Sequence, residues 1–328
     1  MPAVDSQPPL NTKLLFQPLA VKGWTLSNRI VVPPMVSNRD LDHDDAVRWY
    51  RRLAAEGPGL VIVEATRVHR FGTEYTPERI RPVVEAIHAG GAKAAIQLFP
   101  VPIGENWAPA DLSRDKIDEL VDRFVHATRV CVQAGFDGVE PHGAHGYLIN
   151  QFFSPAANRR TDEYGGSVEN RCRFSLRVAQ ACREALGDGL LLYRHTPVET
   201  DSYTVQDSFA LTDRLVEAGL DILDISPGSD RRPGDLAAPF KDRYPQVPII
   251  AVRRMDVVEH AVEVLRKGRA DLVAVGRGML VDATWPAKVR AGQLDQIEHC
   301  DECSVGCFDR LWAGKPVGCA KWPEDYRV

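Results

Sequence analysis

The stretch GVEPHGAHGYLINQFFSP, residues 138–155, organises the rest of the sequence, together with its continuation NRRTDEYGGSVENR at residues 158–171. Its first residues form a short apolar run that predicts a strand. A glycine-rich turn follows, carrying His142, His145 and Tyr147. The continuation is a polar loop with almost no apolar residue to bury. A loop of this kind is either disordered or held by its own hydrogen bonds at a working site.

His142, His145 and Tyr147 are suited to donate hydrogen bonds to one small anion. Neutral imidazole or phenol groups polarise a carbonyl oxygen and stabilise the enolate that forms when the conjugated carbon accepts a hydride. Two other interpretations remain. The histidines can be ordinary polar residues of a turn, or they can bind zinc, although the sequence offers no third ligand nearby.

The chain has 328 residues, which suits two modest domains or one α/β barrel. Its formal net charge is −5 and no block of like charge stands out, so we expect neither a nucleic-acid partner nor a membrane partner. The N-terminus lacks the pattern of a signal peptide, and no run reaches the roughly 18 apolar residues that a membrane span needs. These features predict a cytoplasmic location.

Short Val-, Ile- and Leu-rich runs alternate with amphipathic segments along the chain, as in buried parallel sheets. The predicted strands are residues 29–35, 60–66, 94–99, 138–142, 190–195, 222–227, 247–252 and 272–276. The predicted helices are residues 46–56, a segment that starts between Thr76 and Pro82 and ends at Ala89, and residues 115–134, 168–186, 210–218 and 257–267. Glycine follows the end of most of these helices, as expected of a stop signal.

Eight such strands predict a (β/α)8 TIM barrel. A doubly wound sheet is the alternative, but no Gly-x-Gly-x-x-Gly fingerprint follows the first strand. In a barrel the chemistry lies at the C-terminal ends of the strands. The residues at those ends are therefore the candidates for a binding site.

A flavin mononucleotide (FMN) needs three kinds of group from such a rim. Gln97 can donate to and accept from the pyrimidine edge, and Arg194 can stabilise negative charge near N1. Arg254, Gly276 and Arg277 follow the last two strands, where these barrels usually bind phosphate. The remaining candidate contacts at strand ends are Pro34, Met35, Ala65, His142 and Arg253. The alternative for each arginine is a surface ion pair.

The central stretch resembles the old yellow enzyme family of flavin-dependent oxidoreductases, and the strand ends match the same family from about Leu15 to Lys321. The resemblance implies that His142 and His145 bind the activating group of the substrate and that Tyr147 donates a proton to carbon. Two departures occur. Val36 stands where the family often carries Cys or Thr. Residues 99–107 replace the usual Leu-x-His-x-Gly-Arg pattern, so the resemblance does not identify the substrate of this chain.

Four of the seven cysteines, Cys300, Cys303, Cys307 and Cys319, follow the spacing C-x2-C-x3-C-x11-C. Close thiolates of this kind indicate a metal site. The spacing favours an iron–sulfur cluster over zinc, which usually takes two C-x2-C knuckles. A disulfide pair is not expected in a cytoplasmic chain.

The cysteine pattern resembles the subgroup of the family that contains 2,4-dienoyl-CoA reductase and trimethylamine dehydrogenase. This resemblance implies a 4Fe-4S cluster close to the flavin. It predicts an FMN-binding barrel over residues 1–292 and a cluster-binding C-terminal segment over residues 293–328. Those relatives continue into two nucleotide-binding domains that are absent from these 328 residues. We therefore expect a separate reductase or electron-transfer protein to dock near the cysteines.

These inferences predict an ene-reductase in which reduced FMN delivers hydride to an α,β-unsaturated carbonyl or thioester, with NAD(P)H as a direct or indirect electron donor. An amine or C–H dehydrogenase that passes electrons outward is the alternative. In either case the FMN is expected to be noncovalent, because no cysteine lies near the first strand. A non-enzymatic partner subunit is a third possibility, and a homo-oligomer is left open.

Overall fold

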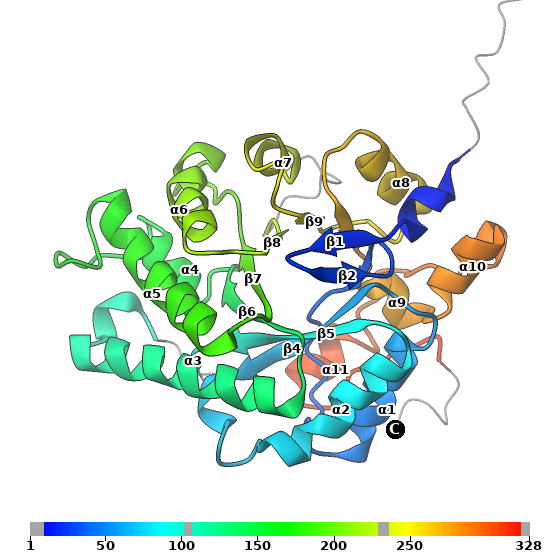
Figure 1. Cartoon of the computed structure of the whole chain (residues 1–328), viewed down its shortest axis with the longest axis horizontal. Coiled ribbons are helices and arrows are strands. Elements are labelled where there is room, and N and C mark those ends of the chain that lie inside the picture. The colour runs from blue at the N-terminus through cyan, green and yellow to red at the C-terminus, as the bar shows by residue number, and fades with distance from the viewer. Residues whose placement is uncertain (1–9, 102–106, 229–235, 323–328) are drawn as a thin grey trace, which may run out of the picture.

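The computed structural model describes residues 10–101, 107–228 and 236–322 (Figure 1). Within these residues eight parallel strands form a closed barrel in the order β10-β3-β4-β5-β6-β7-β8-β9. The strands are β3 (Ile30–Val32), β4 (Leu60–Arg67), β5 (Lys93–Phe99), β6 (Gly138–Gly143), β7 (Leu190–His195), β8 (Ile222–Ile225), β9 (Ile249–Ala251) and β10 (Leu272–Ala274). The predicted (β/α)8 barrel is confirmed, and the doubly wound alternative is excluded because β10 pairs with β3.

Six long helices cover the outside of the barrel at the predicted places: α1 (Asp44–Ala54), α2 (Pro77–Ala89), α3 (Arg114–Ala134), α5 (Val168–Leu186), α6 (Val205–Glu217) and α8 (Val258–Arg266). The prediction placed the start of α6 five residues too late. The side chain of Thr204 accepts from the backbone N–H of Asp207, and the Asp207 carboxylate accepts from the backbone N–H of Thr204. This capping box fixes the earlier start.

Shorter helices occur where the residues show no helical periodicity. They are α4 (Leu148–Phe153), α7 (Ala238–Arg243), α9 (Arg277–Val281), α10 (Trp285–Ala291) and α11 (Phe308–Trp312), with 3-10 turns at η1 (Thr12–Phe16), η2 (Val68–Arg70), η3 (Pro109–Asp111) and η4 (Leu294–Gln296). Segments of five to seven residues are too short for a 3.6-residue period to be recognised.

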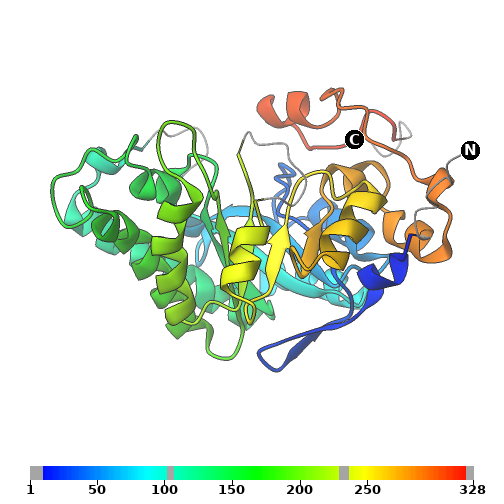
Figure 2. The ribbon, with the colours of Figure 1, turned by 90° about the horizontal axis from the view of Figure 1, so that it is seen from above.

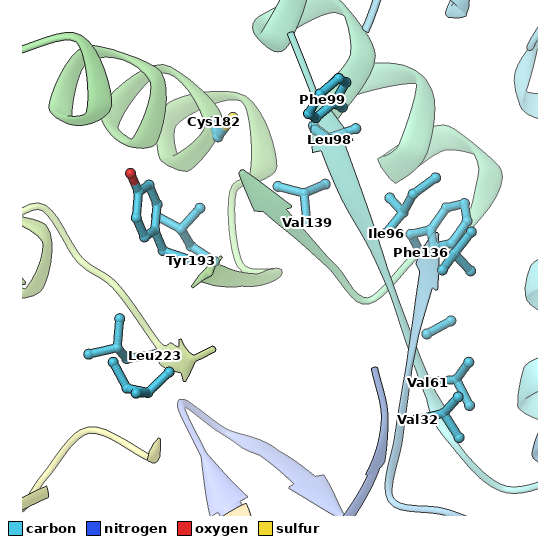
Figure 3. Close-up of a cluster of buried hydrophobic side chains, with 14 of the residues drawn as sticks. Val32, Val61, Ile96, Leu98, Phe99, Phe136, Val139, Cys182, Tyr193 and Leu223 are labelled. Atoms are coloured by element: carbon cyan, nitrogen blue, oxygen red, sulfur yellow. The ribbon is translucent and has the colours of Figure 1, made fainter. Parts of the chain in front are cut away.

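Two apolar layers hold the barrel together, one on each face of its strands. Outward-facing residues such as Val61, Ile96, Val139 and Leu223 are buried beneath the helices (Figure 3). Inward-facing residues of the same strands, including Leu60, Leu190 and Ile222, fill the barrel interior. Burial on both faces explains why these strands appear as continuous apolar runs in the sequence.

An antiparallel hairpin closes one end of the barrel. Its strands are β1 (Leu19–Val21) and β2 (Trp24–Leu26). Val21 and Leu26 are buried against the interior layer, and Leu19 and Trp24 pack around them. In Figure 2 this hairpin (blue) lies at the opposite end of the barrel from α11 (red). The interior is therefore sealed at the end where the strands begin.

Residues 293–322, which we call the cysteine segment, run across the other end of the barrel (Figure 2). The indole N–H of Trp322 donates to the backbone carbonyl of Leu280 over 2.9 Å, and the Trp322 ring packs on Trp49 with centroids 5.9 Å apart. The predicted boundary at residue 292 therefore falls between two parts that contact each other. Among the described residues, no helix has the length and apolar character required to cross a membrane.

Candidate active site

A cavity of about 720 Å³ opens at the C-terminal ends of the strands. Of the predicted site residues, Pro34, Met35, Ala65, Gln97, His142, His145, Tyr147, Arg194 and Arg277 line it. Apolar and aromatic residues complete the walls: Val36, Phe99, Val101, Trp107, Leu148, Leu280, Phe308, Leu311, Trp312 and Val317. The volume and the mixture of apolar walls with a few polar groups are those of a small-molecule or cofactor site.

His142, His145 and Tyr147 form one cluster at the wall of the cavity. His142 lies on β6, and the chain then turns through His145 and Gly146, whose φ angles are +63° and +74°. Two consecutive left-handed residues bring the second histidine back over the strand end. The imidazole centroids are 5.2 Å apart, and the Tyr147 ring lies 5.3 Å from that of His142.

Both histidines are held in the neutral form. Burial lowers the pKa of His142 well below its ordinary value, and the positive charge of Arg194 adds to this effect. Desolvation lowers the pKa of His145 to about 3, with contributions from Arg194 and Arg253. The Nδ1 atom of His142 is buried and has no hydrogen-bond partner among the described groups. A neutral imidazole can donate one hydrogen bond to a ligand oxygen without being a source of net charge.

A hydrogen-bond chain runs from Arg194 to His145 through Ser226. Arg194 donates from Nη2 to Ser226 Oγ over 3.0 Å, and Ser226 Oγ lies 2.8 Å from His145 Nε2. Arginine can only donate, so Ser226 accepts at the Arg194 contact. The contact of Ser226 with Nε2 holds the His145 ring in place at the cavity wall.

The three arginines predicted to contact the cofactor after β9 and β10 have different surroundings. Arg253 and Arg254 follow β9 with φ angles of +79° and +53°. The guanidinium of Arg253 donates to the carbonyl of Pro227, and Arg254 is exposed. Neither lines the cavity. Arg277 lies on the cavity wall but also pairs with Glu302 at 3.2 Å. Phosphate binding by Arg254 and Arg277, and the cofactor contact of Arg253, stay predictions.

Gly276 stands close to the loop that follows β3. An added Cβ at this position would lie 3.3 Å from Pro33 Cγ and 3.6 Å from the sulfur of Met35. The backbone here is therefore packed against Pro33 and against Met35, which was predicted to contact the cofactor. Its N–H is placed before α9, but the residue itself is not part of the cavity wall.

The four clustered cysteines line one further cavity, of about 120 Å³, beside the first. Cys300, Cys303, Cys307 and Cys319 all reach it. No group of three or more Cys, His, Asp or Glu side chains within the described ranges is arranged to hold a single metal ion. A 4Fe-4S cluster does not require several ligands on one metal ion, because each of its four irons binds one cysteine thiolate. The two cavities share Arg277, Leu280 and Cys307.

Sequence reasoning missed several residues of the site. Glu140 and Asp224 lie on β6 and β8 beneath the cavity, fully buried beside Arg194. A charged residue inside an apolar strand run was the signal that could have found both. Phe308, Leu311 and Trp312 of α11 reach the cavity from the cysteine segment. No local pattern could have shown this, because the contact depends on how the segment folds back over the barrel.

The cavity fits a flavin. Gln97 is 1% exposed and its amide nitrogen donates to Glu140 over 2.7 Å, which leaves the amide oxygen for a ligand N–H. Arg194 brings a buried positive charge to the same wall. His142 lines the same cavity, and its buried Nδ1 has no hydrogen-bond partner among the described groups. Fold and cavity together define a TIM-barrel protein that binds a planar cofactor at the C-terminal ends of its strands.

The chain belongs to the NADH:flavin oxidoreductase / NADH oxidase family, which it matches over residues 14–108 and 102–296. It is 31% identical over 348 residues to the NADH oxidase of Thermoanaerobacter brockii, with 90% of this chain and 53% of that protein covered. It is 34% identical over 322 residues to the NADPH dehydrogenase of a Geobacillus species, with 83% and 92% covered. The chain thus spans about half the length of the first of these relatives. The predicted family of flavin-dependent oxidoreductases is confirmed.

Solved structures show the same fold. A complex of 2-naphthoyl-CoA reductase superposes with a TM-score of 0.86 at 24% identity, covering 96% of this chain and 58% of that chain. Histamine dehydrogenase from Rhizobium gives a TM-score of 0.80 at 24% identity, covering 96% and 53%. Morphinone reductase gives 0.75 at 28% identity, covering 85% and 90%.

Proposed function

We propose that the chain is an FMN- and 4Fe-4S-dependent ene-reductase that reduces an α,β-unsaturated carbonyl compound or thioester. One observation carries the proposal: His142, His145 and Tyr147 converge on the wall of a cavity that also contains Gln97 and Arg194. The family supports the flavin and a nicotinamide donor. The similarity to NADPH dehydrogenases and to morphinone reductase supports reduction of a small organic substrate.

His142 and His145 bind the carbonyl oxygen of the substrate. Both are neutral donors that are fixed before the substrate arrives, one by burial and the other by its bond to Ser226. As hydride reaches the β-carbon, negative charge builds up on this oxygen. Donors aimed at the developing charge in a water-poor site lower the barrier without reorganisation.

Tyr147 holds the proton for the α-carbon at its phenol oxygen. Its ring stands at 89° to that of Phe99, with centroids 4.9 Å apart, so its orientation is fixed by an edge contact. The residue is 43% exposed, so solvent can return the proton after each turnover. When bound, FMN supplies the hydride from its N5 atom.

Gln97 and Arg194 would hold the pyrimidine edge of the flavin, with Pro34, Met35 and Ala65 beside the ring system. The backbone after β9 and β10, at Arg253, Arg254, Gly276 and Arg277, would bind the phosphate. We propose noncovalent binding. The described residues of the cavity wall include one cysteine, Cys307, and it belongs to the cysteine cavity as well.

Cys300, Cys303, Cys307 and Cys319 would hold the 4Fe-4S cluster, which supplies one-electron transfer when bound. The shared lining residue Cys307 supports a cluster adjacent to the flavin. Val305, Phe308 and Trp312 expose 58%, 45% and 76% of their surface beside the cysteines. This apolar surface supports the docking of an electron-transfer protein or reductase, with NAD(P)H as the ultimate donor.

An amine or C–H dehydrogenase that passes electrons outward through the cluster is the second candidate. The two cavities share lining residues. This arrangement supports electron transfer from the flavin to the cluster as much as from the cluster to the flavin. Histamine dehydrogenase, an amine dehydrogenase by name, shares the fold, which is consistent with this second candidate.

The two candidates separate in one anaerobic experiment. The purified protein is reduced chemically, a panel of enones and enoyl thioesters is added, and the flavin absorbance is followed. Reoxidation by at least one compound class is expected. Reoxidation by none of them, together with reduction of the oxidised protein by amines, would favour the dehydrogenase.

The electron-carrier proposal has its own test. Stopped-flow mixing of the oxidised protein with NADH or NADPH alone is expected to reduce the flavin more slowly than catalysis requires. Full catalytic speed with the nicotinamide alone would remove the need for a carrier.

A further inference from the structure

Beneath the flavin cavity, two buried carboxyl groups flank one arginine. Glu140, Arg194 and Asp224 lie on the adjacent strands β6, β7 and β8, and all three point into the barrel. Glu140 and Asp224 are both 0% exposed. Arg194 Nε lies 3.2 Å from Asp224 Oδ2. We call Glu140 and Asp224 the acid pair.

The acid pair has too few donors to carry two negative charges. Glu140 Oε1 accepts from Gln97 Nε2 over 2.7 Å. Its Oε2 atom and both carboxylate oxygens of Asp224 have no hydrogen-bond donor among the described groups, apart from the ion contact with Arg194. A buried carboxylate without donors favours its protonated form.

Among the described residues, the barrel interior around the acid pair supplies no cation besides Arg194. The inward-facing residues of β3, β9 and β10 are apolar, including Val31, Ile250 and Leu272. On the cavity side, His142 and His145 are both neutral. Tyr147 and Arg277 also line the cavity, and Arg277 pairs with Glu302. Arg253 donates to the carbonyl of Pro227. Two carboxyls beside one guanidinium are therefore neutral overall when they share one proton.

Burial raises the pKa of both carboxyl groups. For Glu140 the negative charge of Asp224 adds to this rise, while Arg194 opposes it. For Asp224 Arg194 also opposes the rise. Desolvation exceeds the attraction of one shared arginine, so the pair retains a proton near neutral pH.

We propose that the acid pair takes up a second proton from solvent when a flavin bound above Arg194 is reduced, and releases it when the hydride leaves. This inference rests on the proposed function. Two electrons and one proton go to the flavin, which leaves one negative charge at its pyrimidine edge. That charge competes with Asp224 for Arg194. The carboxylate loses part of its only counter-charge, and binding a proton restores neutrality.

The electrons come from a chemical reductant in the test and from the electron donor in turnover, and the proton comes from water. The consequence is functional. A proton balances the added negative charge. The midpoint potential of the flavin therefore changes more steeply with pH than it would if only one proton were bound on two-electron reduction. Glu140 and Asp224 act on the flavin through Arg194, so they are positioning residues rather than catalytic ones.

The test counts protons. The FMN-loaded protein is reduced anaerobically with a chemical reductant in weakly buffered solution at about pH 7, and proton uptake is measured with an indicator dye. The slope of the flavin midpoint potential against pH gives an independent count. Uptake approaching two protons per two electrons is expected, and infrared difference spectra should show a new protonated carboxyl band in the reduced state.

The double variant Asp224→Asn/Glu140→Gln preserves shape and removes both titrating carboxyl groups. It is expected to reduce the uptake to about one proton and to abolish the infrared band. The control Asp137→Asn alters a buried carboxyl at the other end of β6, which bonds to His88 and Lys93. It is expected to keep the wild-type count, and so is His142→Ala.

Several results would overturn the inference. One is a wild-type count of one proton at every pH from 6 to 9, which is decisive even if the double variant does not fold. Another is an uptake of two protons that persists in the double variant. Loss of the second proton in His142→Ala alone would place that proton on the histidine. A protein that binds no flavin would instead contradict the proposed function itself.

Discussion

Val317 donates its backbone N–H to the carbonyl oxygen of Ser37 over 2.8 Å. This contact joins the cysteine segment to the loop that follows β3, which also forms part of the cavity wall. Arg39 donates from Nη1 to the carbonyls of both residues, at 2.8 Å to Val317 and 3.2 Å to Ser37. The proposed cluster site is thus attached to the flavin rim by backbone contacts.

Asn38 is expected to hold the cysteine segment in place. Its Nδ2 atom donates to the carbonyls of Leu311 and Lys315, at 3.0 and 3.1 Å. Asn38→Gly removes both bonds but tolerates the positive φ of +54°. At about 1 kcal/mol per bond, local opening becomes about thirtyfold more frequent. Limited trypsin digestion should then cut faster after Arg310, which lies in α11 next to Leu311. An unchanged cutting rate would contradict this role.

The four cysteines are expected to be equivalent in holding iron. Cys303→Ser removes one thiolate from the cysteine cavity and should lose most of the bound iron and labile sulfide. Cys172→Ala is the matched control, because Cys172 is buried in α5 away from the cavity. Equal iron contents in the two variants, measured after oxygen-free purification, would rule out the proposed ligand set.

His142→Ala and His145→Ala are each expected to weaken the binding of a phenolic ligand about tenfold to a hundredfold. The reason is that one hydrogen bond to a charged oxygen contributes about 1.5–3 kcal/mol. The charge-transfer absorbance of the bound flavin measures this binding, while flavin content should stay unchanged. His43→Ala is the control, since His43 lies outside the cavity at the start of α1. The account fails here if both site variants titrate like the control.

Ligand binding should not follow a histidine titration above about pH 5. Desolvation lowers the pKa of His145 to about 3, so the ring is neutral throughout that range. The folded-state pKa lies below that of the unfolded chain. The corresponding stability is therefore complete above about pH 6.5 and is lost as the pH falls toward 3. Nitrogen NMR of His145 tests this directly, and a midpoint near 6.5 in the folded protein would be incompatible with it.

Much of the fold could be predicted from the sequence because its barrel strands are buried on both faces. Continuous apolar runs ending in polar residues such as Gln97 and Arg194 marked both the strands and the rim. The hairpin from Leu19 to Leu26 was not predicted, because three-residue strands are too short to show a periodic pattern.

The site was predictable where local sequence determines it and not where distant segments meet. The His142–His145 turn depends on two neighbouring left-handed residues, so its sequence revealed it. The approach of Trp312 to the cavity depends on contacts of the cysteine segment with Asn38 and Ser37, far away in sequence. The pairing of Glu140 with Asp224 across Arg194 likewise needed the strand order of the barrel.

The central claim is that one flavin and one cysteine-bound cluster lie side by side on this barrel. The most direct measurement is the cofactor content of protein purified without oxygen. Acid precipitation should release a yellow supernatant with about one FMN per chain, and iron and labile sulfide should each approach about four per chain. A colourless supernatant from protein that also contains no iron would contradict the account.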